Sequence, residues 1–186
     1  NGKPLRVDHR VGDDRITSIL PGLEAYQWSI AAPTLAQHGA QWGVASDLDS
    51  QAVARGQALF QGQANCVACH SGPAFTDVNS FGLHLASASV ALDKNYIKFS
   101  ATKQWRTSPL KGVWQHPPYF HDGSGALNRA TGKCLDGSDI GSLASSTDRA
   151  RQDLACVVNR YNDPKERNLG LTDAQRVDLV EYLKSL

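Results

Sequence analysis

The motif Cys66-Val67-Ala68-Cys69-His70 constrains this chain more than any other feature of its sequence. Cys-x-x-Cys-His is the attachment signature of c-type haem, in which two thiols form thioethers and the histidine ligates the iron. A thioredoxin-like redox site would need a βαβ pattern, which the surrounding sequence lacks, and a zinc site would need two further ligands at finger-like spacing. The motif therefore predicts one covalent haem c, held by Cys66 and Cys69 with His70 on the iron.

The two remaining cysteines, Cys134 and Cys156, flank a polar stretch rich in Gly, Ser and Asp. They are either free thiols or partners in a disulfide. Attachment of c-type haem implies a compartment outside the cytosol, where disulfides form and persist. We therefore expect a disulfide, and in the chain-entropy model a loop of this length contributes roughly 3 kcal/mol to stability.

The composition sets limits on the partners of the chain. Of its 186 residues, 41% are hydrophobic and 20% are charged, which is ordinary for a globular domain. A formal net charge of +1 gives no reason to expect a nucleic-acid partner or an acidic membrane surface. No apolar run approaches the ~18 residues of a membrane span. Because no signal peptide opens the chain, we interpret it as a mature form or a piece of something longer.

Two segments carry the clearest helix signals. Asp49 or Ser50 caps a helix that we expect to end near residue 60, and a capping box at Thr172 opens a last helix that extends to about residue 185. A glycine inside a helix costs about 1 kcal/mol relative to alanine, so a glycine in the first helix indicates close packing. We expect the two helices to cross near Gly56, Phe60 and Tyr182.

The remaining segments show weaker periodicity. We interpret residues 1–48 as an N-terminal arm or linker with a short helical stretch at 23–30, and residues 131–156 as an insertion pinned by the second cysteine pair. Between 106 and 125, the density of Pro, Gly and aromatic residues excludes a continuous regular element. We expect a rigid loop there, lying against a flat apolar group.

The second iron ligand decides what the haem can do. The chain contains no Met, which excludes the His/Met ligation common among electron-transfer cytochromes. The open alternatives are another histidine, a tyrosine, or a site that holds water. The histidines outside the motif are His9, His38, His84, His116 and His121, of which His121 lies in the stiffest turn.

Seven stretches resemble the bacterial dihaem cytochrome c peroxidases and the related enzyme that matures methylamine dehydrogenase. They read RGQALF at 55–60, GPAFTD at 72–77, RTSPLKGVW at 106–114, PYFHDGS at 118–124, VVNRYN at 157–162, LGLT at 169–172 and DLVEYL at 178–183. The resemblance covers roughly residues 50–186 and is to the C-terminal of the family's two haem domains. It implies an all-α, cytochrome c-like domain at 49–186 with long irregular loops.

The resemblance also ranks the candidate iron ligands. In the C-terminal domain of that family, the haem stores and relays electrons, and its distal ligand is a Met or a Tyr. Tyr161 stands where that ligand would be once the insertion is skipped, which puts it ahead of His121, with His84 and His116 behind. The chain departs from the family in having one haem motif rather than two. Either a partner haem domain is missing, or the chain is a monohaem relative.

These features give a leading functional hypothesis of periplasmic, or otherwise extracytoplasmic, one-electron transfer. The partner would be a redox protein or the missing N-terminal haem domain. We expect Trp114 and Phe120, in the 106–125 loop, to contact the haem, and a His or Tyr ligand in place of Met to lower the reduction potential. The alternatives are a peroxidase-like site, which His121, Asp122 and Arg106 would assist, and a sensor that binds a small ligand such as CO or NO.

Overall fold

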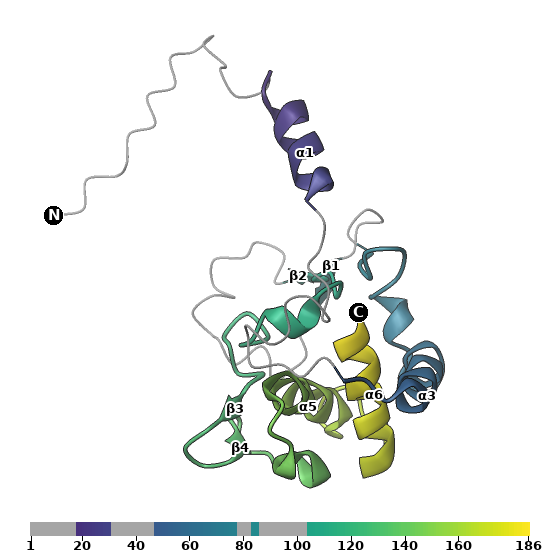
Figure 1. The fold of residues 1–186 in the computed structure, drawn as a ribbon, viewed down its shortest axis with the longest axis vertical. Coiled ribbons are helices and arrows are strands. Elements are labelled where there is room, and N and C mark those ends of the chain that lie inside the picture. Colours follow the sequence, from purple (N-terminus) through teal and green to yellow (C-terminus); the bar gives the residue numbers. More distant parts are fainter. Residues whose placement is uncertain (1–17, 31–46, 78–82, 86–103) are drawn as a thin grey trace, which may run out of the picture. The chain divides into compact units, whose positions relative to one another are not determined.

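The computed structural model describes residues 18–30, 47–77, 83–85 and 104–186 (Figure 1). The chain divides into two compact units, residues 1–32 and 33–186. Most of the expected N-terminal arm, with His9 and His38, lies outside the described residues. The described part is mostly helical with little sheet, as predicted, and it contains no helix that is both long and apolar enough to cross a membrane.

The first unit contains helix α1, Leu20–Ser29, which overlaps the helical stretch expected at 23–30. Pro21 stands in the first turn, where a missing backbone N–H costs nothing because that group has no partner within the helix. Leu23 and Tyr26 are exposed on α1.

The second unit is built on two helices whose ends follow the predicted caps. Helix α3, Ser50–Gln61, begins after Asp49, whose Oδ1 accepts hydrogen bonds from the backbone N–H groups of Gln51 and Ala52 at 2.9 and 3.1 Å. Helix α6, Asp173–Ser185, begins with the expected capping box. These side chains satisfy backbone donors that the first turn leaves without partners.

Helices α3 and α6 cross where a glycine allows close approach. A Cβ atom on Gly56 would lie 2.0 Å from the carbonyl oxygen of Asp178 and 2.7 Å from Cβ of Tyr182. The rings of Phe60 and Tyr182 meet edge to face, with centroids 5.2 Å apart. The crossing expected from the sequence is therefore confirmed, and Arg55 fastens it with two 2.8 Å hydrogen bonds to the Asp178 carboxylate.

Helix α5, Arg149–Asn162, packs beside α6 (Figure 1). It begins within the segment 131–156 that the sequence indicated as an insertion, so the end of that segment is regular and carries Cys156. Ala150, Leu154 and Val158 are buried at a spacing of four residues, which forms a helical face.

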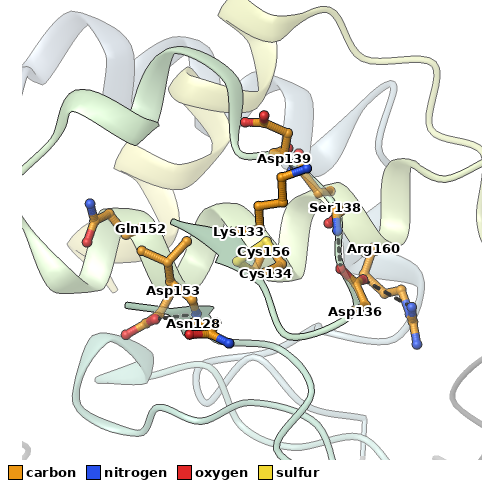
Figure 2. Close-up of a disulfide and its surroundings, with 12 residues drawn as sticks. Asn128, Lys133, Cys134, Asp136, Ser138, Asp139, Gln152, Asp153, Cys156 and Arg160 are labelled. Atoms are coloured by element: carbon orange, nitrogen blue, oxygen red, sulfur yellow. Dashed lines mark hydrogen bonds and ion pairs between the residues drawn. A yellow bond between two sulfur atoms is a disulfide. The ribbon is translucent and has the colours of Figure 1, made fainter. Parts of the chain in front are cut away.

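Two short antiparallel sheets complete the unit. Strand β1, Leu83–Leu85, pairs with β2, Gln104–Arg106, and β3, Leu127–Asn128, pairs with β4, Lys133–Cys134. Figure 2 shows Cys134 of β4 bonded to Cys156 of α5. The predicted disulfide is thus confirmed, and both of its cysteines are buried.

A buried charged network joins the ends of the three main helices. Lys184 of α6 is fully buried, and its Nζ donates to Asp148 Oδ2 at 2.5 Å and to the carbonyl oxygen of Asp47 at 3.1 Å. Asp148 also caps α5 through two backbone N–H groups. Arg151 adds an ion pair with Glu181 and a 2.9 Å hydrogen bond to the Asp47 carbonyl. The network ties the residue that precedes α3 to α5 and α6.

Candidate functional site

The predicted haem-binding motif lies just after α3 in a tight turn. The 3-10 helix η2, Cys66–Ala68, follows Asn65, whose backbone is left-handed with φ of 46°. The carbonyl of Cys66 accepts from the backbone N–H of Cys69 at 3.2 Å and from that of His70 at 2.8 Å. The turn therefore places two thiols and an imidazole together, as attachment of one haem requires.

The His70 ring is oriented by the chain that follows it. Its Nδ1 lies 3.1 Å from the backbone carbonyl oxygen of Phe75. A carbonyl can only accept, so Nδ1 carries the proton and Nε2 carries the lone pair that can bind a metal. An outer hydrogen bond of this kind fixes the tautomer and direction of a metal-ligating histidine. The residues present therefore fit an iron ligand at His70.

The loop between His70 and Phe75 supplies that carbonyl through its backbone shape. Gly72 and Phe75 both have positive φ, 71° and 54°, and the backbone N–H of Thr76 donates to the carbonyl of Ser71 at 2.8 Å. The Gly72-Pro73 pair in the sequence indicates a break in regular structure. The hydrogen bond from His70 to Phe75 could not be predicted from the sequence, because Phe75 contributes only its main-chain oxygen.

The motif thiols are available for covalent attachment. Neither Cys66 nor Cys69 is in a disulfide. Burial raises the pKa of the Cys66 thiol to about 11, and burial also raises the pKa of Cys69. Among the described side chains, no group of three or more His, Cys, Asp and Glu gathers to hold a metal ion.

Aromatic rings from three segments pack around the motif. Phe60 of α3 meets Phe75 edge to face at 6.1 Å and Tyr182 of α6 at 5.2 Å. Burial raises the pKa of the Tyr182 phenol, and the proximity of Cys66 raises it further. Cys66 itself packs against the main hydrophobic cluster. Cys66 is therefore packed against the hydrophobic cluster that contains Phe60 and Tyr182, the ring pair at the crossing of α3 and α6.

Tyr161, near the end of α5, lies in the same region. Burial raises the pKa of its phenol. Arg167 opposes that rise, and the charge that Cys66 or Cys69 would carry adds to it, so the phenol is within electrostatic range of both thiols. Even so, 37% of the Tyr161 surface is exposed. The ring is therefore partly enclosed by protein, and the rest of its surface is accessible to a bound group.

Phe120 reaches Tyr161 from the 106–125 loop. The two rings meet edge to face with centroids 5.8 Å apart. Phe120 has a positive φ of 65°, and a Cβ on Gly125 would lie 2.8 Å from its ring. The loop is braced by a bridge between Tyr119 and Gly125 and by a 2.9 Å hydrogen bond from the Tyr119 hydroxyl to the Val113 carbonyl. Most of the loop is irregular, as predicted, and its rigidity stays a prediction.

Trp114 does not lie beside Phe120 and Tyr161 but near the other end of α5. Trp114 lies in the 3-10 helix η5, Val113–Gln115, and packs against Ala150 in the first turn of α5. Ala150 is roughly 16 Å along the helix axis from Tyr161, since each residue adds about 1.5 Å. Haem contact by Trp114 stays a prediction.

The histidine candidates are spread over the loop and the first sheet. His121 stacks on Trp105, with ring centroids 4.1 Å apart and planes 28° from parallel. His84 is the backbone partner of Trp105 in the β1–β2 sheet, and His116 is exposed. A role for any of the three as an iron ligand stays a prediction.

Comparison with known proteins gives a family match and two curated relatives. Residues 53–186 match the family model for cytochrome c. The chain is 26% identical over 136 residues to "Methylamine utilization protein MauG" of Methylorubrum extorquens, a match that covers 71% of this chain and 33% of that protein. It is 24% identical over an alignment of 208 positions to "Cytochrome-c peroxidase IdrP1" of Denitromonas iodatirespirans, which covers 92% of this chain and 50% of that protein. No solved structure matches.

The share of each relative that is matched limits what can be transferred. The chain spans about a third of one curated relative and half of the other. The activities in their names belong to those longer proteins.

Proposed function

Because the chain belongs to the cytochrome c family, which implies covalently bound haem c, we propose that it carries one haem and transfers single electrons in the periplasm. The observation that carries the proposal is the hydrogen bond between His70 Nδ1 and the Phe75 carbonyl, which presents Nε2 as a ligand beside two reduced thiols. When bound, the haem would supply a carrier that accepts and gives up one electron between Fe(III) and Fe(II).

Each residue of the site has a distinct part in the proposal. Cys66 and Cys69 would hold the haem through thioethers, and His70 would ligate the iron. Phe60 and Tyr182 would pack against the porphyrin and exclude water on one side. Haem iron in such a setting would exchange electrons with a partner protein.

We further propose Tyr161 as the second iron ligand. Its phenol is within electrostatic range of both motif thiols, and it comes from α5, a helix other than the one that precedes the motif. The Phe120 ring restricts its movement. A Met ligand raises the reduction potential of haem c, and this chain has no Met, so we expect a potential well below that of His/Met cytochromes c.

The test is a redox titration of the purified haem protein, combined with low-temperature EPR of its ferric form. Tyrosinate ligation predicts a low potential and a high-spin ferric signal that changes in Tyr161→Phe. A potential in the His/Met range would contradict the proposal. A purely low-spin signal that is unchanged in Tyr161→Phe would exclude Tyr161 and favour a histidine.

One finding favours a second candidate, a peroxidase-like activity. The match to a cytochrome-c peroxidase extends over 92% of this chain. Reduction of peroxide consumes two electrons and two protons and yields two molecules of water, so a single haem needs a reduced donor to supply the balance. Peroxide-dependent oxidation of a reduced cytochrome c would support this candidate. No consumption of peroxide beyond that of free haem would leave electron transfer as the function.

A further inference from the structure

One face of α5 is held by the segment that begins at Cys134, the first cysteine of the disulfide. We call residues 134–141 the clamp loop. Cys134 is bonded to Cys156, Asn159 Nδ2 donates to the Asp139 carbonyl at 2.5 Å, and Arg160 Nη1 lies 3.1 Å from Asp136 Oδ2. Positions 156, 159 and 160 are spaced by three and four residues, so they share one side of the helix. Figure 2 shows both loop carboxylates beside this side of α5.

The clamp loop is stiff enough to act as one body. The Cys134 carbonyl accepts from the N–H of Gly137 at 2.8 Å, and the Cys134 N–H donates to the Ser138 carbonyl at 2.9 Å. Asp136 Oδ1 accepts from the N–H of Ser138 at 2.9 Å. Next to it, Ile140 is buried in the main hydrophobic cluster. Both carboxylate oxygens of Asp136 are thus held: Oδ1 by the backbone N–H of Ser138 and Oδ2 by Arg160.

Arg160, in the last turn of α5, links the clamp loop to the end of the helix. Its guanidinium lies between Asp136 and Glu166, whose Oε1 is 3.6 Å from Arg160 Nε, and the side chains of all three are less than one-fifth exposed. Tyr161 is the next residue. Successive residues turn by about 100° around a helix axis, so Tyr161 leaves the clamped face and points toward another side, where it meets Phe120. A rotation of α5 that released Arg160 would displace Tyr161 equally.

We propose that Asp136, acting through Arg160 and supported by the Cys134–Cys156 disulfide, is a positioning residue that holds Tyr161 at the haem. The inference rests on the proposed function, because it assumes that Tyr161 ligates the iron. It goes further by assigning the disulfide loop a part in the site, although the loop lies on a different face of α5.

The direct test compares Asp136→Asn with the wild-type haem protein by ferric EPR and absorption spectroscopy. Asparagine keeps the size of the side chain and removes the charge that holds Arg160. We expect a mixture of two ferric species, of which the new one matches the spectrum of Tyr161→Phe. Asp136→Glu restores the charge and should return most of the wild-type signal.

Arg129→Gln is the matched control. Arg129 Nη2 pairs with Asp153 Oδ2 at 2.8 Å, so it also fastens a loop to α5, but Asp153 is roughly 12 Å along the helix from Tyr161. This substitution should lower the thermal midpoint without changing the ferric spectrum. If Arg129→Gln produced the same new species as Asp136→Asn, general loosening of the fold would explain both, and the positioning role would be rejected.

A second variant tests the disulfide by replacing Cys134 and Cys156 with alanine. It should show the new ferric species in larger proportion than Asp136→Asn, and where it does not fold, Asp136→Asn decides alone. A wild-type spectrum in Asp136→Asn, while Tyr161→Phe differs, would overturn the inference and leave the proposed function intact. A wild-type spectrum in Tyr161→Phe itself would remove Tyr161 from the proposed function and the positioning role with it.

Discussion

The carbonyl oxygen of Asp178 lies 2.0 Å from the point where residue 56 would carry a Cβ, and Gly56 is the residue that leaves this space open. The obstacle is the main chain of another helix, which cannot rotate away as a side chain could. The close contact of the two helices also determines the distance between the rings of Phe60 and Tyr182, whose centroids are 5.2 Å apart. A single missing methyl group thus connects helix packing to the site.

Gly56→Ala should therefore destabilise the domain, although alanine favours helix. The gain in helix propensity is about 1 kcal/mol, and the added carbon forces α3 and α6 apart at a typical cost of 1–3 kcal/mol or more. Urea unfolding would measure the difference. Gln57→Ala, one residue on and exposed, is the control and should change stability by less than about 0.5 kcal/mol. Equal stabilities of Gly56→Ala and the wild type would show that the helices can separate freely.

Lys184→Met should cost more than most single substitutions. It leaves the buried Asp148 carboxylate with Arg151 at 3.5 Å as its remaining cationic neighbour in the described residues. Removing one partner of a buried ion pair typically costs about 3–5 kcal/mol. In the double variant with Asp148→Asn, the loss should be smaller, because no uncompensated charge remains and asparagine still caps a helix. A double variant less stable than Lys184→Met would contradict this explanation.

Asp49 should make the stability of the domain depend on pH. Hydrogen bonds from the backbone N–H groups of Ala52 and Gln51 lower the pKa of its carboxyl below the ordinary value of 3.8. A carboxyl with a lowered folded-state pKa stabilises the fold above its unfolded pKa, and that contribution disappears as the pH falls through the folded value. Asp49→Asn caps the helix without titrating. The stability advantage of the wild type over Asp49→Asn should therefore be larger at pH 6 than at pH 2.5 in urea titrations, and a constant difference would be evidence against the cap.

Gly125→Ala should disturb the site from the loop side. Its Cβ would meet the Phe120 ring at 2.8 Å and Cβ of Tyr119 at 2.9 Å, so Phe120 must move off its contact with Tyr161. We expect a changed ferric absorption spectrum with haem still attached. Gly132→Ala is the control: Gly132 has a positive φ of 69°, but nothing lies within 4 Å of the new carbon, so this substitution should leave that spectrum unchanged.

The parts of this fold that the sequence predicted are those with local signals. Asp49 and Thr172 are cap residues, and each marks the start of its helix at the correct position. Gly56 stands inside a helical pattern, which already indicates close packing. The disulfide followed from the compartment that haem attachment implies.

Features that depend on distant partners could not be predicted in this way. The start of helix α5 was not predicted, because residues 131–156 were interpreted as one insertion. The sequence does carry local signals for this helix: Asp148 is its cap, and Ala150, Leu154 and Val158 repeat every four residues. Lys184 occupies the last turn of a helix, where exposure is usual, and its buried ammonium is satisfied by two distant groups, the Asp148 carboxylate and the Asp47 carbonyl. The carbonyl of Phe75 has no side-chain signature at all.

The measurement that tests the central claim most directly is the intact mass of the protein under denaturing conditions, with the pyridine haemochrome spectrum of the same sample. Protein made in a host that attaches c-type haem should carry the mass of one haem on Cys66 and Cys69, and the cofactor should stay bound after acid–acetone extraction. Protein with the mass of the bare polypeptide, or haem that is extracted completely, would contradict covalent attachment and the function proposed from it.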